Sequence, residues 1–398
     1  MTLLPAVLIA AASGSAIAWF SWWGLVKALH PTAKSPDPID ITKLAFTLAG
    51  GIGAVVALVV AYRRQRDVEQ GRFVERFGAA AAQLGASQIA VRIAGVYAMA
   101  GVANESKGPQ RQQCIDVLCG YLRLPYSPER GSNYQTKHIE KRKSSGNEDL
   151  EVENHFEYLQ NDREVRQTIL RVIADHLRSR QFNWSSASFD FRDAYLENVN
   201  FSSTSFKGEA RFEGSTLVGA ANFDYSELMG WVQFDNCTFS NDASFNYVKF
   251  GDVNFEGVTF GGKAEFWDVE FSSSIDFSKA SFRQVEFMDA AFLGVRSDFR
   301  DAVFEGSVTF AGSTFSGRCD FGKAKFKDEA RFSASFRGGA TFDETDFGLQ
   351  LIDFQHVRRW GSSPGWSHGW RQSKFDWSED RSLKPPNVQP TIWPPEFP

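Results

Sequence analysis

The sequence has few of the residues that usually build reactive sites. Its 398 residues include only four cysteines and six histidines. The cysteines show neither the paired spacing of a zinc site nor the density of a disulfide framework; they are Cys114, Cys119, Cys237 and Cys319. The histidines lack the HExxH spacing of a metalloprotease. We therefore expect no metal, no cofactor and a reducing compartment.

Catalytic motifs are also missing. The chain has no phosphate-binding P-loop, and its "GGIG" at 50–53 lies inside an apolar run, where it favours close helix packing. No pair of carboxylates stands out as a general acid and base. These absences predict that the protein is not an enzyme.

Charge is absent from two N-terminal stretches, Leu3 to Val26 and Leu44 to Tyr62. Each is long enough to cross a bilayer as a helix, and no basic residue precedes the first, as a cleaved signal peptide would require. Three tryptophans stand near the end of the first stretch, as in an interfacial belt; they are Trp19, Trp22 and Trp23. We predict a two-helix transmembrane hairpin over residues 1–62, with spans at 3–26 and 44–62. The alternative is two buried helices of a soluble domain.

Basic residues near the predicted spans suggest an orientation. The loop region offers three lysines, whereas five arginines follow the second span; they are Arg63, Arg64, Arg66, Arg72 and Arg76. The positive-inside rule then places both termini in the cytoplasm. Small residues four positions apart, such as Gly50 and Ala54, would let helices approach closely in lipid. Assembly of several copies through them stays open.

The middle of the chain is predicted to be helical, with one interruption. Residues 63–124 have apolar residues at helical spacing and are expected to form a small all-α juxtamembrane module. Residues 125–158 are polar and mixed in charge, which is typical of a linker. Residues 159–182 are expected to form a further helix that leads into the next region, with carboxylates at its start and arginines at its end.

A repeat occupies the region from Phe191 to Phe347. Large apolar residues recur there at 30 positions, at nearly every step five or six residues apart, and 27 of the 30 are phenylalanine. When the 30 positions are written in rows of four, steps longer than five residues occur only from the second position to the third and from the fourth position to the first of the next row. This pattern predicts a square coil with four short strands per turn and about seven turns, because strand alternation points each large residue toward the axis. A smaller residue two positions earlier points the same way, which places Cys237 and Cys319 in the core.

Several repeat units, such as "ANFDY" (221–225) and "VNFEG" (253–257), resemble the pentapeptide repeat. The segments between residues 63 and 182 also resemble the juxtamembrane region of bacterial membrane-anchored pentapeptide-repeat proteins. The resemblance implies a right-handed quadrilateral β-helix over 183–354 and a multi-pass protein of the bacterial inner membrane. The Trp- and Pro-rich residues 355–398 are expected to cap the coil; a partner-binding tail is the alternative.

The function expected from these features is non-enzymatic. A rigid coil without a reactive site suggests a membrane-anchored scaffold whose partners are the lipid bilayer and a protein of unknown identity. The region from Asp190 to Asp353 has 27 acidic and 15 basic residues, a net charge of −12. The alternative function is therefore a DNA mimic that inhibits a type II topoisomerase, an activity known for some pentapeptide-repeat proteins, and we expect no direct binding of nucleic acid. Trp231 and Trp267, predicted to point outward, are the candidate contact residues.

Overall fold

A computed structural model describes residues 16, 19, 20, 22–24, 27, 38–128, 137–143, 151–157, 162–360 and 384–391. The chain divides into two compact units, Met1–Arg76 and Phe77–Pro398. Helix α2 (Pro38–Leu84) is continuous and includes the second predicted span and the arginines that follow it. No helix in the described ranges is both long enough and apolar enough to cross a membrane. The predicted transmembrane hairpin is therefore not found, and its first span lies almost entirely outside these ranges.

Three further helices form a small module: α3 (Ile89–Glu105), α4 (Pro109–Arg123) and α5 (Asp162–Arg178). Gly95 of α3 approaches the end of α2 so closely that a Cβ there would lie 2.7 Å from the backbone nitrogen of Leu84. The fully buried Arg92 donates to Asp162 Oδ1 at 2.8 Å, and Tyr121 donates to the same oxygen at 2.5 Å. Because a buried charge needs a partner, this triad ties the three helices together.

The expected linker contains one regular element. Strands β1 (Lys137–Lys143) and β2 (Glu151–Glu157) pair in antiparallel register, with Lys137 opposite Glu157 and Lys143 opposite Glu151. Lys141 of β1 forms an ion pair with Glu153, its register partner on β2. A cross-strand charge pair gives no signal in a search for hydrophobic alternation, so the sequence did not predict this hairpin.

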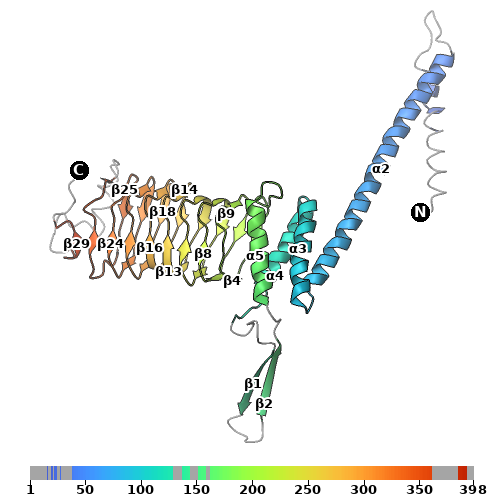
Figure 1. The fold of residues 1–398 in the computed structure, drawn as a ribbon. Helices are drawn as coiled ribbons and strands as arrows, with labels where there is room; N and C mark the ends of the chain where they lie inside the picture. The colour runs from blue at the N-terminus through green and yellow to red at the C-terminus, as the bar shows by residue number, and fades with distance from the viewer. Residues whose placement is uncertain are drawn as a thin grey trace, which may run out of the picture. The chain divides into compact units, whose positions relative to one another are not determined.

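The repeat folds as a parallel coil of about eight turns with four sides (Figure 1). We number the sides by the core residue of one turn: side 1 has Phe255, side 2 Phe260, side 3 Phe266 and side 4 Phe271. All 30 predicted core positions are buried, none more than 6% exposed. The predicted square coil and its register are therefore confirmed.

The strands of sides 4 and 1 form one sheet and those of sides 2 and 3 the other. Side 4 is built from β5 (Ser205–Phe206), β14 (Glu270–Phe271), β17 (Ala291–Phe292), β21 (Thr314–Phe315), β25 (Ser335–Phe336) and β28 (Arg359–Trp360). Side 1 is built from β3 (Phe189–Asp190), β6 (Ala210–Arg211), β15 (Ile275–Asp276), β18 (Arg296–Asp298), β22 (Arg318–Asp320) and β26 (Ala340–Thr341). Strands β9 (Glu227–Gln233) and β12 (Lys249–Asn254) run from side 4 into side 1.

The second sheet follows the same plan. Side 2 is built from β4 (Tyr195–Glu197), β7 (Thr216–Val218), β10 (Thr238–Phe239), β19 (Val303–Phe304) and β23 (Lys325–Phe326). Side 3 is built from β8 (Ala221–Asn222), β11 (Ala243–Ser244), β20 (Val308–Thr309), β24 (Ala330–Arg331), β27 (Ile352–Asp353) and β29 (Val388–Gln389). Strands β13 (Thr259–Glu265) and β16 (Ser281–Glu286) turn the corner from side 2 to side 3. Their register shifts after Phe260, because the six-residue step from Phe260 to Phe266 lies beside the five-residue step from Phe282 to Phe287.

The phenylalanines stack in columns along the coil axis. On side 1 the ring of Phe255 lies 4.9 Å from Phe234 below and 4.9 Å from Phe277 above, nearly parallel to both. Its edge meets the face of Phe266 on side 3 at 6.1 Å. Both arrangements are favourable for aromatic quadrupoles, and the stacking distance matches the spacing of hydrogen-bonded strands.

Side chains of the helical module cover the first turn of the coil. Arg166 of α5 donates to the carbonyl of Tyr195 at 2.9 Å, and Arg178 donates to the carbonyls of Asn200 at 2.8 Å and Ser202 at 2.7 Å. Gln112 of α4 exchanges hydrogen bonds with the backbone of Ser188. The backbone groups that a preceding turn would have bonded are thus satisfied by side chains.

At the C-terminal end of the coil, β28 and β29, two strands far apart in the sequence, add to the last turns. Phe354 stacks on Phe332 at 4.4 Å, and β28 pairs with β25. In the predicted cap, β29 pairs with β27, where the amide of Ile352 donates to the carbonyl of Asn387 at 3.0 Å. The described part of the tail thus bonds to the last complete strand of side 3.

Replacing one stacked ring tests the column. Phe255→Ala removes a ring between two stacked neighbours and should cost about 3–5 kcal/mol of unfolding free energy. Phe255→Leu should cost less than about 1.5 kcal/mol, because leucine already stands at three core positions of the coil. Urea unfolding followed by circular dichroism measures both. Ser272→Ala, at an exposed position of side 4, is the control, and equal losses for the two Phe255 variants would contradict the stacking account.

Candidate interaction surface

The outward side chains of the coil are not uniform. Within residues 183–354, ten large apolar side chains are exposed, and eight of them lie at the two corners that bound side 4; the other two, Leu349 and Leu351, lie in the last turn between sides 2 and 3. The corner with side 3 has Tyr225, Tyr247, Trp267 and Met288, and the corner with side 1 has Met229, Trp231, Leu293 and Val295. An apolar cluster on one side of an otherwise polar surface is typical of a contact site.

Two tyrosines form a stack on the outside of the corner between sides 3 and 4. The rings of Tyr225 and Tyr247 lie 4.8 Å apart with an interplanar angle of 4°, and the residues are 63% and 45% exposed. Both have positive φ angles, 58° and 59°, which set their side chains outside the strand. The sequence interpretation missed this pair, although both tyrosines stand two residues after a core phenylalanine, where most turns have polar residues.

Trp231 lies at the other corner of side 4. It is 55% exposed and follows Glu227 and Met229 along β9, whose alternate side chains point away from the core. Its register partner in the next turn is Asp252. The indole therefore stands on the surface with a carboxylate beside it.

Trp267 is less free than Trp231. It is 37% exposed, and its indole Nε1 donates to Glu286 Oε2 at 3.0 Å on side 3. The Lys263 ammonium lies 5.6 Å from the ring centroid and forms ion pairs with Glu265 at 2.7 Å and Glu286 at 3.0 Å. The structure thus brings Trp231 and the tyrosines to side 4 and ties Trp267 to a polar cluster on side 3.

The carboxylates around side 4 have no basic partners. In turns two to five, this side and its corners carry six acidic residues and two basic residues, Lys249 and Arg296; the acidic residues are Asp224, Glu227, Asp252, Asp268, Glu270 and Asp289. In the described part of the chain, none of the six forms an ion pair. Side 4 therefore combines exposed aromatic rings with uncompensated negative charge.

Side 1 is also acidic, but many of its carboxylates are paired. Asp298 forms ion pairs with Arg296 at 2.6 Å and Arg300 at 2.8 Å, and Glu256 with Lys279 at 2.7 Å. Asp235 differs, because its Oδ1 is buried without a hydrogen-bond partner. Burial, and then the nearby charges of Glu213, Glu256 and Asp276, raise the pKa of Asp235 to about 6.

The buried thiols are inert. All four cysteines are 1% exposed or less. Burial raises the pKa of Cys237 to about 12 and that of Cys114 to about 11, so neither forms the thiolate that nucleophilic or metal chemistry needs. Among the residues with a described position, no group of three or more His, Cys, Asp and Glu side chains could hold a metal ion.

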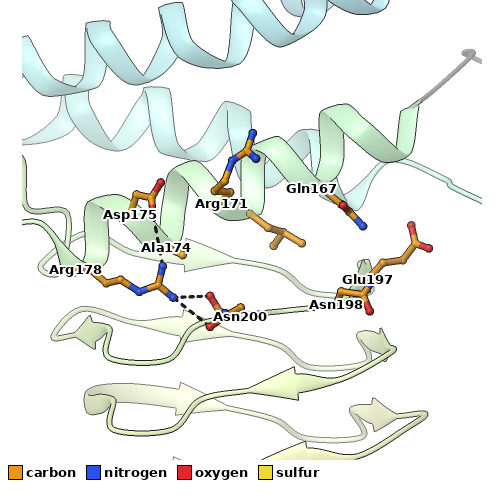
Figure 2. Close-up of a pocket in the computed structure, with 9 residues that line it drawn as sticks. Gln167, Arg171, Ala174, Asp175, Arg178, Glu197, Asn198 and Asn200 are labelled. Atoms are coloured by element: carbon orange, nitrogen blue, oxygen red, sulfur yellow. Dashed lines mark hydrogen bonds and ion pairs between the residues drawn. The ribbon is translucent and has the colours of Figure 1, made fainter.

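A pocket lies between α5 and the first turn of the coil (Figure 2). Its volume is about 390 Å³, and its lining includes Gln167, Arg171, Asp175, Arg178 and Asn200. The Arg178 guanidinium is engaged with Asn200 and lies 3.4 Å from Asp175. The lining residues contribute no thiol, imidazole or hydroxyl group, and the acidic side chains among them are Asp175 and Glu197.

Comparison with known proteins supports the repeat. A family model described as pentapeptide repeats (9 copies) matches residues 223–270 and 296–335. The matched turns include Tyr225, Trp231, Tyr247 and Trp267. No curated protein matches the chain. The comparison thus identifies pentapeptide repeats within the coil.

Neutralising Asp235 tests the electrostatics of side 1. Because its folded pKa is raised, the proton on Asp235 stabilises the fold at low pH, and that stability is lost as pH rises through about 6. At pH 8, Asp235→Asn should therefore have a free energy of unfolding higher than that of the wild type by on the order of 1 kcal/mol, after allowance for solvent screening. At pH 4, where the wild-type carboxyl is protonated in the folded state, most of this gain should disappear. The exposed Asp268→Asn is the control. A gain for Asp235→Asn that is the same at both pH values would contradict the account.

Proposed function

We propose that the protein is a non-enzymatic scaffold that presents its coil to a protein partner. The observation that supports this proposal is the concentration of exposed large apolar residues at the corners of one side, which hold eight of the ten within residues 183–354. Surface residues that serve only solubility would be polar at every corner, as they are between sides 1 and 2 of the coil. Side 4 is the surface that the scaffold offers.

The coil suits this role because its shape does not depend on a ligand. Each turn bonds to the next through its backbone, and the core is filled with stacked rings. A side chain on one turn therefore keeps a constant distance from its equivalents on other turns, in steps of about 4.8 Å. Such a surface is pre-organised, which lowers the entropic cost of binding.

DNA mimicry is less favoured by the distribution of charge. Phosphates on DNA are accompanied only by mobile counterions, whereas carboxylates of side 1 such as Asp298 are fixed in ion pairs with arginine. The unpaired acidic residues of side 4 are interrupted by apolar side chains. Neither side presents the continuous rows of free charge that a duplex does.

We further propose that the N-terminal unit attaches the scaffold to a membrane, with the coil in the cytoplasm. Aliphatic side chains of α2 are left exposed, for example Leu58 at 72% and Val60 at 59%. Such side chains are stable only when covered, and lipid or a second copy of the helix could cover them. The arginines from Arg63 onward favour the cytoplasmic side of a bacterial inner membrane.

Partner capture tests the scaffold function. Photo-crosslinking in cells from a probe at Lys249, on side 4, should yield a discrete protein adduct. The same probe at Thr309, which is part of β20 on side 3, is the control and should yield at least about tenfold less. Phe255→Ala combined with Phe277→Ala should abolish the side 4 adduct, because the surface exists only on the folded coil. Equal adducts from both positions, or none from either, would refute the proposal.

Cell fractionation tests the attachment. The full chain should sediment with membranes and be released by detergent. Leu58→Arg with Val60→Arg should move most of the protein to the supernatant, because each buried arginine costs about 2.5–3.5 kcal/mol in a bilayer. Lys249→Arg, on the coil, is the matched control. A wild-type chain that stays in the supernatant would refute membrane attachment, and oligomers there would assign the exposed face of α2 to self-association.

A further inference from the structure

Side 4 combines two kinds of group that recognise cations. Tyr225 and Tyr247 expose stacked rings, and Trp231 exposes an indole at the opposite corner. Aromatic faces attract ammonium and, more often, guanidinium groups, and the attraction grows when water is excluded. Leu293 and Val295, 47% and 83% exposed, extend this surface with aliphatic contacts.

The second kind of group is the unpaired carboxylate. Glu227 lies on β9 between Tyr225 and Met229, and Asp252 is the register partner of Trp231 in the next turn. Asp268 and Asp289 follow Tyr247 at the same corner position in the next two turns, and all four side chains are exposed. A carboxylate accepts two parallel hydrogen bonds from a guanidinium group, so rings and acids on this side favour the same ligand group.

We propose that side 4 binds a basic, arginine-rich segment of a partner protein. This inference rests on the proposed scaffold function and names the class of its partner. The arginine side chains stack on the exposed rings and form ion pairs with the carboxylates, and apolar side chains of the segment contact Met229, Leu293 and Val295.

The charge of side 4 argues against the other occupants of an apolar face. A second copy docked through the same side would bring two sets of six carboxylates together, each with one lysine and with Arg296, which is already paired with Asp298. Like charges in such contact cost several kcal/mol. Anionic lipid and nucleic acid are disfavoured for the same reason.

The size of the surface indicates a short segment rather than a globular face. Four turns extend about 14 Å along the coil, and one side is about 16 Å wide. This area is well below the roughly 800 Å² per partner of a standard protein–protein interface. An extended basic peptide lying along the coil fits it.

Fluorescence anisotropy with labelled synthetic peptides tests the proposal on the full chain in detergent. A peptide of repeating Arg-Leu-Gly should bind saturably at low salt, and a peptide of repeating Glu-Leu-Gly should not. Trp231→Ser with Tyr247→Asn should raise the dissociation constant at least about tenfold. Asp268→Lys with Asp289→Lys should do the same. Asparagine and lysine are tolerated at these turn positions, where Asn236 and Lys279 have φ angles of 54° and 58°.

The matched control is Asp193→Lys with Glu344→Lys, at exposed positions of the same kind between sides 1 and 2. It should change the dissociation constant less than about twofold, and circular dichroism should show every variant folded. Equal binding of the acidic peptide, equal loss in the control, or no saturable binding to the wild type would each overturn the proposal. A change of oligomeric state in the side 4 variants would assign the face to a second copy instead. If crosslinking from side 4 succeeds while the arginine peptide fails, the scaffold function stands and only the partner class is refuted.

Discussion

The stacking of one turn on the next is the interaction on which the coil depends. Rings in a column lie mostly 4.8 to 5.3 Å apart, and the backbone bonds that join neighbouring turns require nearly the same spacing. Two-residue strands such as β14 and β15 have too few hydrogen bonds to persist alone. These strands are stable because two interactions act on each turn: its core rings stack on those of the neighbouring turns, and its backbone amides bond to their carbonyls. Neither interaction suffices without the other.

A structure that propagates in this way must also be terminated. Arg166, Arg178 and Gln112 of the helical module donate hydrogen bonds to backbone carbonyls of the first turn. Without them, this open edge of the coil could pair with another strand. Long side chains can reach backbone carbonyls that no helix backbone could approach. The triad of Arg92, Tyr121 and Asp162 in turn keeps α3, α4 and α5 in place, so the cap is itself rigid.

The period of the phenylalanines was enough to predict the four sides, the register and the core positions, because a buried side chain repeats wherever the backbone repeats. The caps could not be predicted in this way. Arg166 and Arg178 look like ordinary charges on a helix until the carbonyls they bond are known. Trp231 and Trp267 were expected to point outward, yet sequence alone could not show that Glu286 and Lys263 hold Trp267 while Trp231 stays open. The predicted register places Tyr225 and Tyr247 side by side, but the pair was missed because sequence alone did not show that positive φ angles turn both rings outward and stack them.

The core and the surface of the coil are therefore under separate constraints. Inward positions must be phenylalanine, leucine or a small residue in every turn, whereas outward positions need only suit a short strand or a corner. The position two residues after a core phenylalanine accepts Tyr225 and Asp268 at one corner and Lys279 at another, all with positive φ angles near 50–60°. Residues that differ so much in chemistry at equivalent positions are not required by the fold. The gathering of aromatic rings and unpaired carboxylates on side 4 consequently needs an explanation outside folding, and recognition of a cationic partner provides one.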